Sequence, residues 1–503
     1  MRKTMVKFMA RLMFVGCALL LLCASSYSKV TAEEKAAIAE KIEKALEHKD
    51  FKNALVGIYA VSLESGKEIY AYNADITMIP ASNNKLFTTA AALDALGPDY
   101  TYETDLMRVG TIKNGILEGH LVIVGSGDPT ISGRFNEGDV TAALRGWVDK
   151  VKAAGIQRVE GYVIGDDDLW NDDYYGESWD WSEVGEWYSA PSSALSFNDN
   201  CVDLIWTPAE KPGQAATFTL QPETQYLRFE NYVTTRKKGS GSDRYYHRAM
   251  NSPDVRIRGG IDIDSEPKTD SATVDNPTLY FAAVLCELLE RAGVEVAKGP
   301  ADIDQFENKQ AFQEGRQSIA THQSPPLSEI VRVINKRSQN FYADQVLRTL
   351  GKAKGGDGGY RSGTRAVIEF LKDKKVSTDG FRMSDGSGLS WINHTSSRTL
   401  VELLRAMRRH RHAAAFVDSL PIGGEAGTLK YRFGETSRQR KVQPQVRGKT
   451  GLIAYTRTLA GYYTSESGEE MVFAVMLNNY TAGRPLTWID RLATIIFTEG
   501  KGW

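Results

Sequence analysis

The sequence has few cysteines, no excess of charge of either sign and no apolar run long enough to cross a bilayer. Four cysteines among 503 residues are too few for a small disulfide-stapled fold. The 61 basic and 63 acidic side chains give a net charge of -2, so we expect no nucleic-acid partner. The longest apolar run has about 13 residues, whereas a transmembrane helix needs roughly 20. We therefore expect a mature chain without a transmembrane helix, and its length predicts two or three domains.

The longest apolar run lies near the N-terminus and has the surroundings of an export signal. Four basic residues within the first eleven precede the apolar run 12–24, and a small or polar run, 25–28, follows it. This order is typical of a cleaved, Sec-type secretory signal peptide. We expect residues 1–28 to be removed and the mature protein to be exported to the periplasm.

Removal of the signal peptide leaves two cysteines, Cys201 and Cys286. Cys286 falls in an amphipathic helix pattern at 280–290, where a cysteine usually packs as a small apolar residue. An exported protein can pair two such cysteines, and the sequence leaves this question open.

Hydrophobic periodicity divides the rest of the chain into three parts. Residues 54–62 and 68–72 are predicted to form a strand hairpin, and a helix over 85–96 ends at a Gly-Pro pair. Short alternating strands predominate from about 100 to 270. Further helices are predicted at 277–293, 327–336, 340–350, 362–374 and 396–410, strands at 445–450, 457–464 and 470–478, and a last helix at 486–498.

This order of elements predicts one discontinuous domain that carries a long insertion. The strands at the two ends of the chain can share one antiparallel sheet flanked by helices, with an all-helical region beside it. We expect a mixed α/β fold, with the main domain formed by 33–97 and 275–503 and a β-rich insertion at 98–274.

A serine-lysine pair at the start of the first predicted helix carries the most informative chemistry. Ser82 and Lys85 are three residues apart and therefore lie on the same face of a helix. A partly desolvated lysine can lose its proton and activate a serine hydroxyl, and the positive helix end favours negative charge near that serine. The S-x-x-K pattern alone is weak, because it occurs twice elsewhere; an N-cap serine followed by a solvated lysine is the simpler alternative.

Two further short motifs follow in the order that serine-lysine enzymes require. Ser338-x-Asn340 lies between two predicted helices, and Lys449-Thr450-Gly451 lies on a predicted strand. Together with S-x-x-K they match the motif set of serine β-lactamases and penicillin-binding proteins. Agreement in both order and element type favours a catalytic interpretation. The seven histidines are scattered without metal-ligand spacing, and we expect no metal or cofactor.

The chain resembles the S13 family of penicillin-binding proteins, which are D-alanyl-D-alanine carboxypeptidases and endopeptidases. The likeness covers most of 45–480 and includes a β-rich insertion between the first two motifs, which serine β-lactamases typically lack. The resemblance implies a β-lactamase/transpeptidase-like main domain, peptidoglycan stem peptides as substrates and covalent binding of β-lactams. Other blocks of the sequence that are similar to the family are 124–130, 193–200, 324–330, 385–389 and 420–429.

The same resemblance implies a role for each catalytic residue. Ser82 would attack the carbonyl between the last two D-alanines, or a D-amino-acid cross-link, after Lys85 takes its proton. Ser338 with Lys449 would pass a proton to the leaving amine. Asn340 would hold both the substrate amide and Lys85.

The strand motif is implied to bind the substrate. Thr450, followed by Gly451, would bind the terminal carboxylate, and the backbone N–H groups of Ser82 and Leu452 would form the oxyanion hole. The family often has Thr or Ser where this chain has Leu452. We expect the lost hydroxyl to affect substrate affinity rather than acylation.

Two other functions share these motifs. A serine β-lactamase must deacylate drugs quickly, and no carboxylate for that step is identifiable in the sequence. A non-catalytic wall-binding or penicillin-sensing protein would not require Lys85 and Ser338 together. The acidic, aromatic stretch 166–188 either borders the site or packs as a surface loop, and we expect the surface loop.

Overall fold

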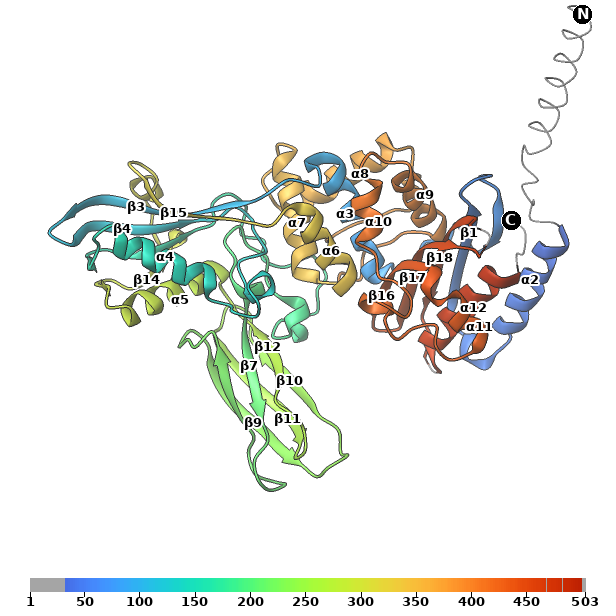
Figure 1. The fold of residues 1–503 in the computed structure, drawn as a ribbon, viewed down its shortest axis with the longest axis horizontal. Coiled ribbons are helices and arrows are strands. Elements are labelled where there is room, and N and C mark those ends of the chain that lie inside the picture. The colour runs from blue at the N-terminus through green and yellow to red at the C-terminus, as the bar shows by residue number, and fades with distance from the viewer. Residues whose placement is uncertain (1–31, 467, 482, 500–503) are drawn as a thin grey trace, which may run out of the picture.

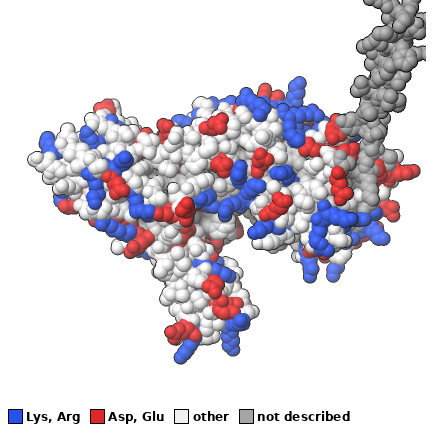
Figure 2. Space-filling view, viewed as in Figure 1, with Lys and Arg blue, Asp and Glu red and all other residues white. Residues whose placement is uncertain are grey.

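The computed structural model describes residues 32–466, 468–481 and 483–499. The expected signal peptide at 1–28 lies outside these residues. Within them, no helix combines the length and the apolar character needed to cross a membrane. Lysines, arginines and acidic residues are interspersed on the face shown in Figure 2, consistent with the balanced net charge.

The two ends of the chain share one five-stranded antiparallel sheet, as predicted. Strand β1 pairs with β18 from Leu55 opposite Asn478 to Ser62 opposite Met471. In sheet order the strands are β16 (Val446–Ile453), β17 (Thr456–Thr464), β18 (Glu470–Asn478), β1 (Leu55–Ser62) and β2 (Glu68–Tyr72).

Helices cover both faces of this sheet, and the strands are correspondingly buried along their length. Because side chains alternate along a strand, Ile58 and Ala60 contact one cluster, whereas Tyr59 and Val61 contact the other. The first cluster includes the terminal helices α2 (Ala32–Leu46) and α12 (Pro485–Glu499), and the second includes the helical region. Figure 1 shows the terminal helices side by side.

The helical region surrounds one fully buried helix. Residues 84–93 of α3 (Asn84–Leu96) are all buried, as expected of a helix that neighbours enclose on every side. The helices around it are α6 (Leu327–Arg337), α7 (Asn340–Ala353), α8 (Tyr360–Asp373) and α10 (Ala413–Asp418), and α9 (Ser397–Arg408) packs between α10 and the sheet.

The insertion has its own core and three sheets of its own (Figure 1). Helices α4 (Ala142–Ala153) and α5 (Pro277–Arg291) pack together in that core. The largest sheet contains β3 (Glu103–Lys113), β4 (Ile116–Val124), β5 (Arg158–Val159), β6 (Val163–Asp166), β13 (Glu295–Val296), β14 (Pro300–Asp302) and β15 (Gln317–Gln323). A second sheet contains β7 (Cys201–Thr207), β8 (Thr217–Gln221) and β12 (Lys268–Thr273), and a projecting third contains β9 (Arg228–Arg236), β10 (Asp243–Arg248) and β11 (Asp254–Asp262).

The expected return to the main domain at 275 is too early. Helix α5 packs in the core of the insertion, and β15 pairs with β3 as far as Gln323 opposite Glu103. The periodicity of 277–293 indicated an amphipathic helix, but periodicity does not identify the core that the apolar face contacts. We propose 98–324 as the inserted unit.

The remaining cysteines are both buried and both free. Cys201 begins β7 and Cys286 lies on α5. The open question of their pairing is thereby answered, because neither forms a disulfide.

A buried arginine joins the insertion to the helical region. Arg348 of α7 is fully buried and donates hydrogen bonds to the carbonyls of Asn171, Asp173 and Ser192, which all belong to the insertion. Its guanidinium also lies 4.8 Å from the centre of the Trp170 ring. These contacts attach the part of the insertion between Trp170 and Ser192 to helix α7.

We expect Arg348→Met to destabilise the protein by about 3 kcal/mol, because it leaves several buried carbonyls without a donor. Thermal or urea denaturation measures the loss. Arg361→Met, at an exposed position on the neighbouring α8, is the matched control and should change stability little. Equal stability of the two variants would contradict the assigned role of Arg348.

Candidate active site

Ser82 lies in a single 3₁₀ turn, Ala81–Asn83, immediately before α3. The sequence had placed it at the start of the helix itself. The turn is sharp, because Ala81 adopts a left-handed backbone with φ of 47°, which costs energy for a residue with a Cβ. A Cβ at Gly388 would lie only 2.0 Å from the Ala81 carbonyl oxygen. Glycine at 388 therefore lets a second loop pack directly against the turn.

Three groups surround the amine of Lys85. Nζ lies 3.1 Å from Ser82 Oγ, 2.6 Å from Asn340 Oδ1 and 2.5 Å from the Ser387 carbonyl oxygen. A neutral amine has two hydrogens and one lone pair. The amide and the carbonyl oxygens can only accept and therefore take both hydrogens, which leaves the lone pair for the Ser82 hydroxyl.

Burial favours this neutral form. Lys85 is fully buried, and burial lowers its pKa to about 8, against the opposing effect of the Asp344 and Asp385 carboxylates. Lys449 is equally buried, and its pKa lies well below the ordinary value because of burial and the nearby Lys85 charge. Two buried amines at one site thus disfavour each other's protonation.

Lys449 connects the strand motif to the helical motif. On β16 its Nζ donates hydrogen bonds to Ser338 Oγ, at 2.8 Å, and to the Thr450 carbonyl, at 2.7 Å. Ser338 caps the end of α6 with φ of 59°, so the chain turns there before α7 begins at Asn340. This turn brings the Ser338 hydroxyl to the lysine.

Gly451 allows β16 to approach the turn of Ser82. A Cβ at this position would lie 2.0 Å from Thr458 Oγ1 and 2.7 Å from the Pro80 carbonyl oxygen. Thr458 Oγ1 donates a hydrogen bond to that same carbonyl, so a larger residue at 451 would disrupt this contact and push β16 away from the turn of Ser82.

The acidic, aromatic stretch 166–188 borders the site, and the expectation of a plain surface loop is wrong. Asn340 Nδ2 donates to the Tyr188 carbonyl at 2.8 Å. Earlier in the same stretch, Trp179 Nε1 donates to Asp385 Oδ2 at 2.9 Å. The insertion therefore contributes a wall of the site.

Two buried carboxylates hold the loop that carries the Ser387 carbonyl. Asp344 Oδ1 accepts the backbone N–H groups of Gly386 and Ser387, and Asp385 accepts that of Gly388, at 2.8 Å. Asp385 belongs to the block 385–389, which resembled the family but had no predicted role, and Asp344 was not predicted at all. A residue that acts through its backbone carbonyl can be of any type, so the sequence does not identify it. The one available signal was Asp344, an aspartate on the apolar face of the helix predicted at 340–350.

The end of the site that contains Thr450 has one further hydroxyl. Thr450 Oγ1 donates to Thr428 Oγ1 at 2.7 Å, and Thr428 lies in the short turn Gly427–Leu429. Leu452 is 64% exposed, so its side chain contributes little to packing. Thr428 lies in the block 420–429 that resembles the family, but no role was predicted for it, because a threonine in a loop has no chemical pattern of its own.

One group of acidic residues in the described chain has spacing suited to a cation. Carboxylate oxygens of Asp167, Asp302 and Asp304 lie within 4.8 Å of one another, in the insertion. Lys309 already forms an ion pair with Asp304, and Thr278 donates to Asp167. Asn276 donates to Asp302, so each of the three carboxylates already has a partner within the protein.

The structure brings all the motif residues together. Ser82, Lys85 and Asn340 form one hydrogen-bonded group, and Ser338 and Lys449 form a second. The arrangement pairs a serine with a buried amine as its base, and a second hydroxyl with a second amine.

Comparison with known proteins agrees with this geometry. A protein-family model described as the D-Ala-D-Ala carboxypeptidase 3 (S13) family matches residues 38–496. A D-alanyl-D-alanine carboxypeptidase from Actinomadura sp. (strain R39) is 30% identical over 474 residues, which cover 91% of this chain and 84% of the relative. The D-alanyl-D-alanine carboxypeptidase DacB of Haemophilus influenzae is 25% identical over 433 residues, covering 85% of this chain and 86% of the relative.

A solved structure shows the same fold. The crystal structure of penicillin-binding protein 4 from Haemophilus influenzae superposes with a TM-score of 0.76 at 24% identity, covering 90% of this chain and 97% of the other. The predicted mixed α/β, transpeptidase-like fold is confirmed by this likeness. Because the family model spans nearly all of the described residues, the chain belongs to the S13 family of D-Ala-D-Ala carboxypeptidases.

Proposed function

We propose that this protein is a serine-type D-alanyl-D-alanine carboxypeptidase that hydrolyses peptidoglycan stem peptides through an acyl-enzyme on Ser82. The observation that carries the proposal is the position of Lys85, a buried amine that lies 3.1 Å from Ser82 Oγ and has oxygen acceptors for its two hydrogens. Penicillin and other β-lactams acylate the same hydroxyl.

Acylation begins when neutral Lys85 takes the proton of Ser82. Oγ attacks the carbonyl carbon between the two terminal D-alanines, and the backbone N–H groups of Ser82 and Leu452 stabilise the oxyanion. As the amide C–N bond breaks, Ser338 gives its hydroxyl proton to the leaving amine and regains one through Lys449, which relays the proton that Lys85 took from Ser82. The products of this half-reaction are an ester on Ser82 and free D-alanine, whose carboxylate had been bound at Thr450.

Water then hydrolyses the ester and restores Ser82. In the described part of the chain, no carboxylate forms a hydrogen bond with Ser82 or Lys85, which supports slow release of bound β-lactam and favours a peptidase over a β-lactamase. An acyl-enzyme that water reaches slowly is the basis of covalent penicillin binding.

The same chemistry applies to cross-linked stem peptides, which lie outside the cytoplasm. In a D,D-cross-link the scissile amide also follows a D-alanine and precedes a D-centre, so we include D,D-endopeptidase activity in the proposal. The expected signal peptide at 1–28 supports action in the periplasm, where this substrate lies.

We expect Ser82→Ala to abolish covalent labelling by a fluorescent penicillin and release of D-alanine from a pentapeptide, because the ester has no other oxygen to form on. Gel fluorescence and D-alanine assay measure the two losses. Ser65→Ala, in an exposed turn, should retain both activities. Undiminished labelling of Ser82→Ala would refute the assignment of the nucleophile.

The acylation rate should rise with pH through about 8, the pKa of Lys85, because only the neutral amine accepts the Ser82 proton. Stopped-flow labelling between pH 6 and 10 measures the profile. Lys85→Arg keeps the charge at all these pH values and should lower the rate about 10²- to 10⁴-fold. A flat wild-type profile would contradict the role of Lys85 as base.

Leu452→Thr should lower the KM for a D-Ala-D-Ala peptide about tenfold or more with little change in kcat, because a hydroxyl added beside Thr450 can bind the carboxylate. A hydrogen bond to a charged group contributes about 1.5–3 kcal/mol. Leu452→Ala, which shortens the same exposed side chain without adding a donor, is the control. An equal KM for both variants would show that the carboxylate does not reach this position.

A further inference from the structure

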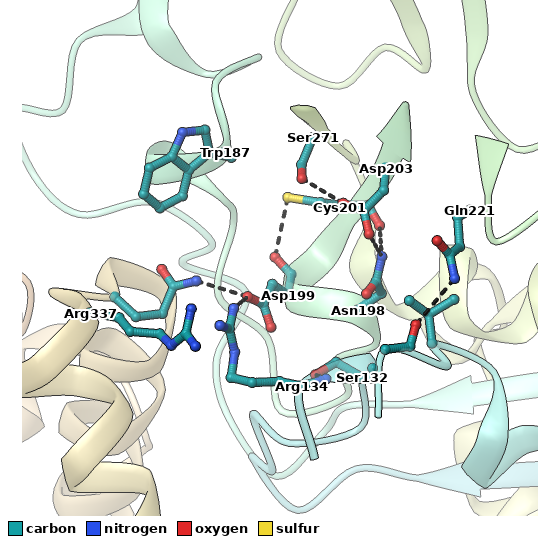
Figure 3. Close-up of a pocket in the computed structure, with 14 residues that line it drawn as sticks. Ser132, Arg134, Trp187, Asn198, Asp199, Cys201, Asp203, Gln221, Ser271 and Arg337 are labelled. Atoms are coloured by element: carbon teal, nitrogen blue, oxygen red, sulfur yellow. Dashed lines mark hydrogen bonds and ion pairs between the residues drawn. The ribbon is translucent and has the colours of Figure 1, made fainter. Parts of the chain in front are cut away.

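A cavity of about 530 Å³ lies next to the turn that carries Ser338. One wall consists of Arg337 and Gln339, the two neighbours of Ser338 in the chain. The other walls belong to the insertion, including Arg134 and Asp199, with Trp187 at the edge (Figure 3). The volume is within the range of sites that bind small ligands.

The polar groups of this cavity are only partly paired. Asp199 Oδ2 accepts from Arg134, at 2.6 Å, and from Gln339 Nε2, at 2.8 Å. Asp199 Oδ1 and Gln339 Oε1 are buried without a hydrogen-bond partner. The guanidinium of Arg337 has no hydrogen bond or ion pair among the described residues, and Figure 3 shows it on the same side of the cavity as that of Arg134. An unpaired donor and two unpaired acceptors thus belong to residues that line the same cavity.

The acidic side of the cavity is built on a strained turn. Asn198, Asp199 and Asn200 all have left-handed backbones, with φ of 49°, 55° and 54°. Asn and Asp tolerate this region better than other side chains, but a run of such residues costs energy that the surrounding structure must offset. The hydrogen bonds from Arg134 and Gln339 to Asp199 are among the contacts that offset this cost.

The positive and negative side chains that line the cavity determine which class of ligand it can bind. A polyanion would be repelled by Asp199 and by Asp203, which also lines the cavity. A peptide segment supplies both a carboxylate for the free guanidinium and amide N–H groups for the unpaired oxygens. The cavity therefore fits a peptide better than a phosphate group or a polyanion.

The position of the cavity relates it to the leaving group of the reaction. Ser338 is the residue from which the leaving amine receives its proton in the proposed mechanism, and the residues on both sides of Ser338 line the cavity. In a carboxypeptidase reaction the leaving amine belongs to D-alanine, which is small. In a cross-linked substrate it belongs to a second stem peptide, which must extend past Ser338.

We propose that this cavity binds the second stem peptide of a cross-linked peptidoglycan substrate, with a carboxylate on Arg337 and backbone amides on Asp199 and Gln339. The inference rests on the proposed function and adds to it a subsite for the leaving group. Contacts made there stabilise the transition state for cross-link cleavage and not for release of D-alanine.

The test compares Arg337→Gln with wild type on two substrates, a monomeric pentapeptide muropeptide and a D,D-cross-linked dimer, with products separated by mass spectrometry. We expect kcat/KM for the dimer to fall about tenfold or more, because a charge-assisted hydrogen bond is lost. Arg337→Glu should lower it further, because it places a negative charge near the carboxylate. Release of D-alanine from the pentapeptide and acylation by penicillin should stay within about twofold, which also shows that the variants fold.

Arg332→Gln is the matched control, since Arg332 is exposed on the same helix and does not line the cavity. An equal loss on both substrates, or an unchanged rate on the dimer, would overturn the proposed subsite while leaving the carboxypeptidase assignment intact. A wild-type protein that acts on neither substrate would instead refute the proposed function, and the subsite with it.

Discussion

The hydrogen bonds of the buried Lys85 amine determine where the elements around it must lie. An isolated ammonium is expensive to bury, so Lys85 is tolerated inside the protein because it can be neutral and because oxygen acceptors surround its nitrogen. Those acceptors come from an amide side chain on α7 and a backbone carbonyl in the 385–390 loop. Each must be placed to within a few tenths of an ångström, and neither belongs to the helix that carries the lysine.

Much of the molecule can be understood as support for that placement. Asp344 and Asp385 bind the backbone of the loop that presents the Ser387 carbonyl. Trp179 reaches this loop from the insertion, and Arg348 ties the insertion to α7. The insertion therefore helps to position the groups that contact Lys85. It also contributes most of the cavity beside Ser338, where the leaving group of a larger substrate is proposed to bind.

The features that were predictable from the sequence are those with a local pattern. Periodicity located the helices and strands, and three short motifs identified Ser82, Ser338 and Lys449 before their proximity was known. The boundary of the insertion was misplaced because the apolar face of α5 does not specify its partner core. Ser387 and Thr428 lie in blocks that resemble the family, but their roles were not predictable, because Ser387 contacts Lys85 through a backbone carbonyl and Thr428 lies in a loop without a recognisable motif.

The charge of Lys85 in the free enzyme is the most direct test of this view of the site. NMR of protein labelled with ¹³C at lysine Cε, with the Lys85 signal assigned by its absence from Lys85→Arg, would follow its protonation as pH is raised. A titration midpoint near 8 is expected for an amine whose burial favours the neutral form. A midpoint at the ordinary lysine value of about 10.4 would mean that Lys85 stays protonated at working pH, and would contradict its role as the base for Ser82.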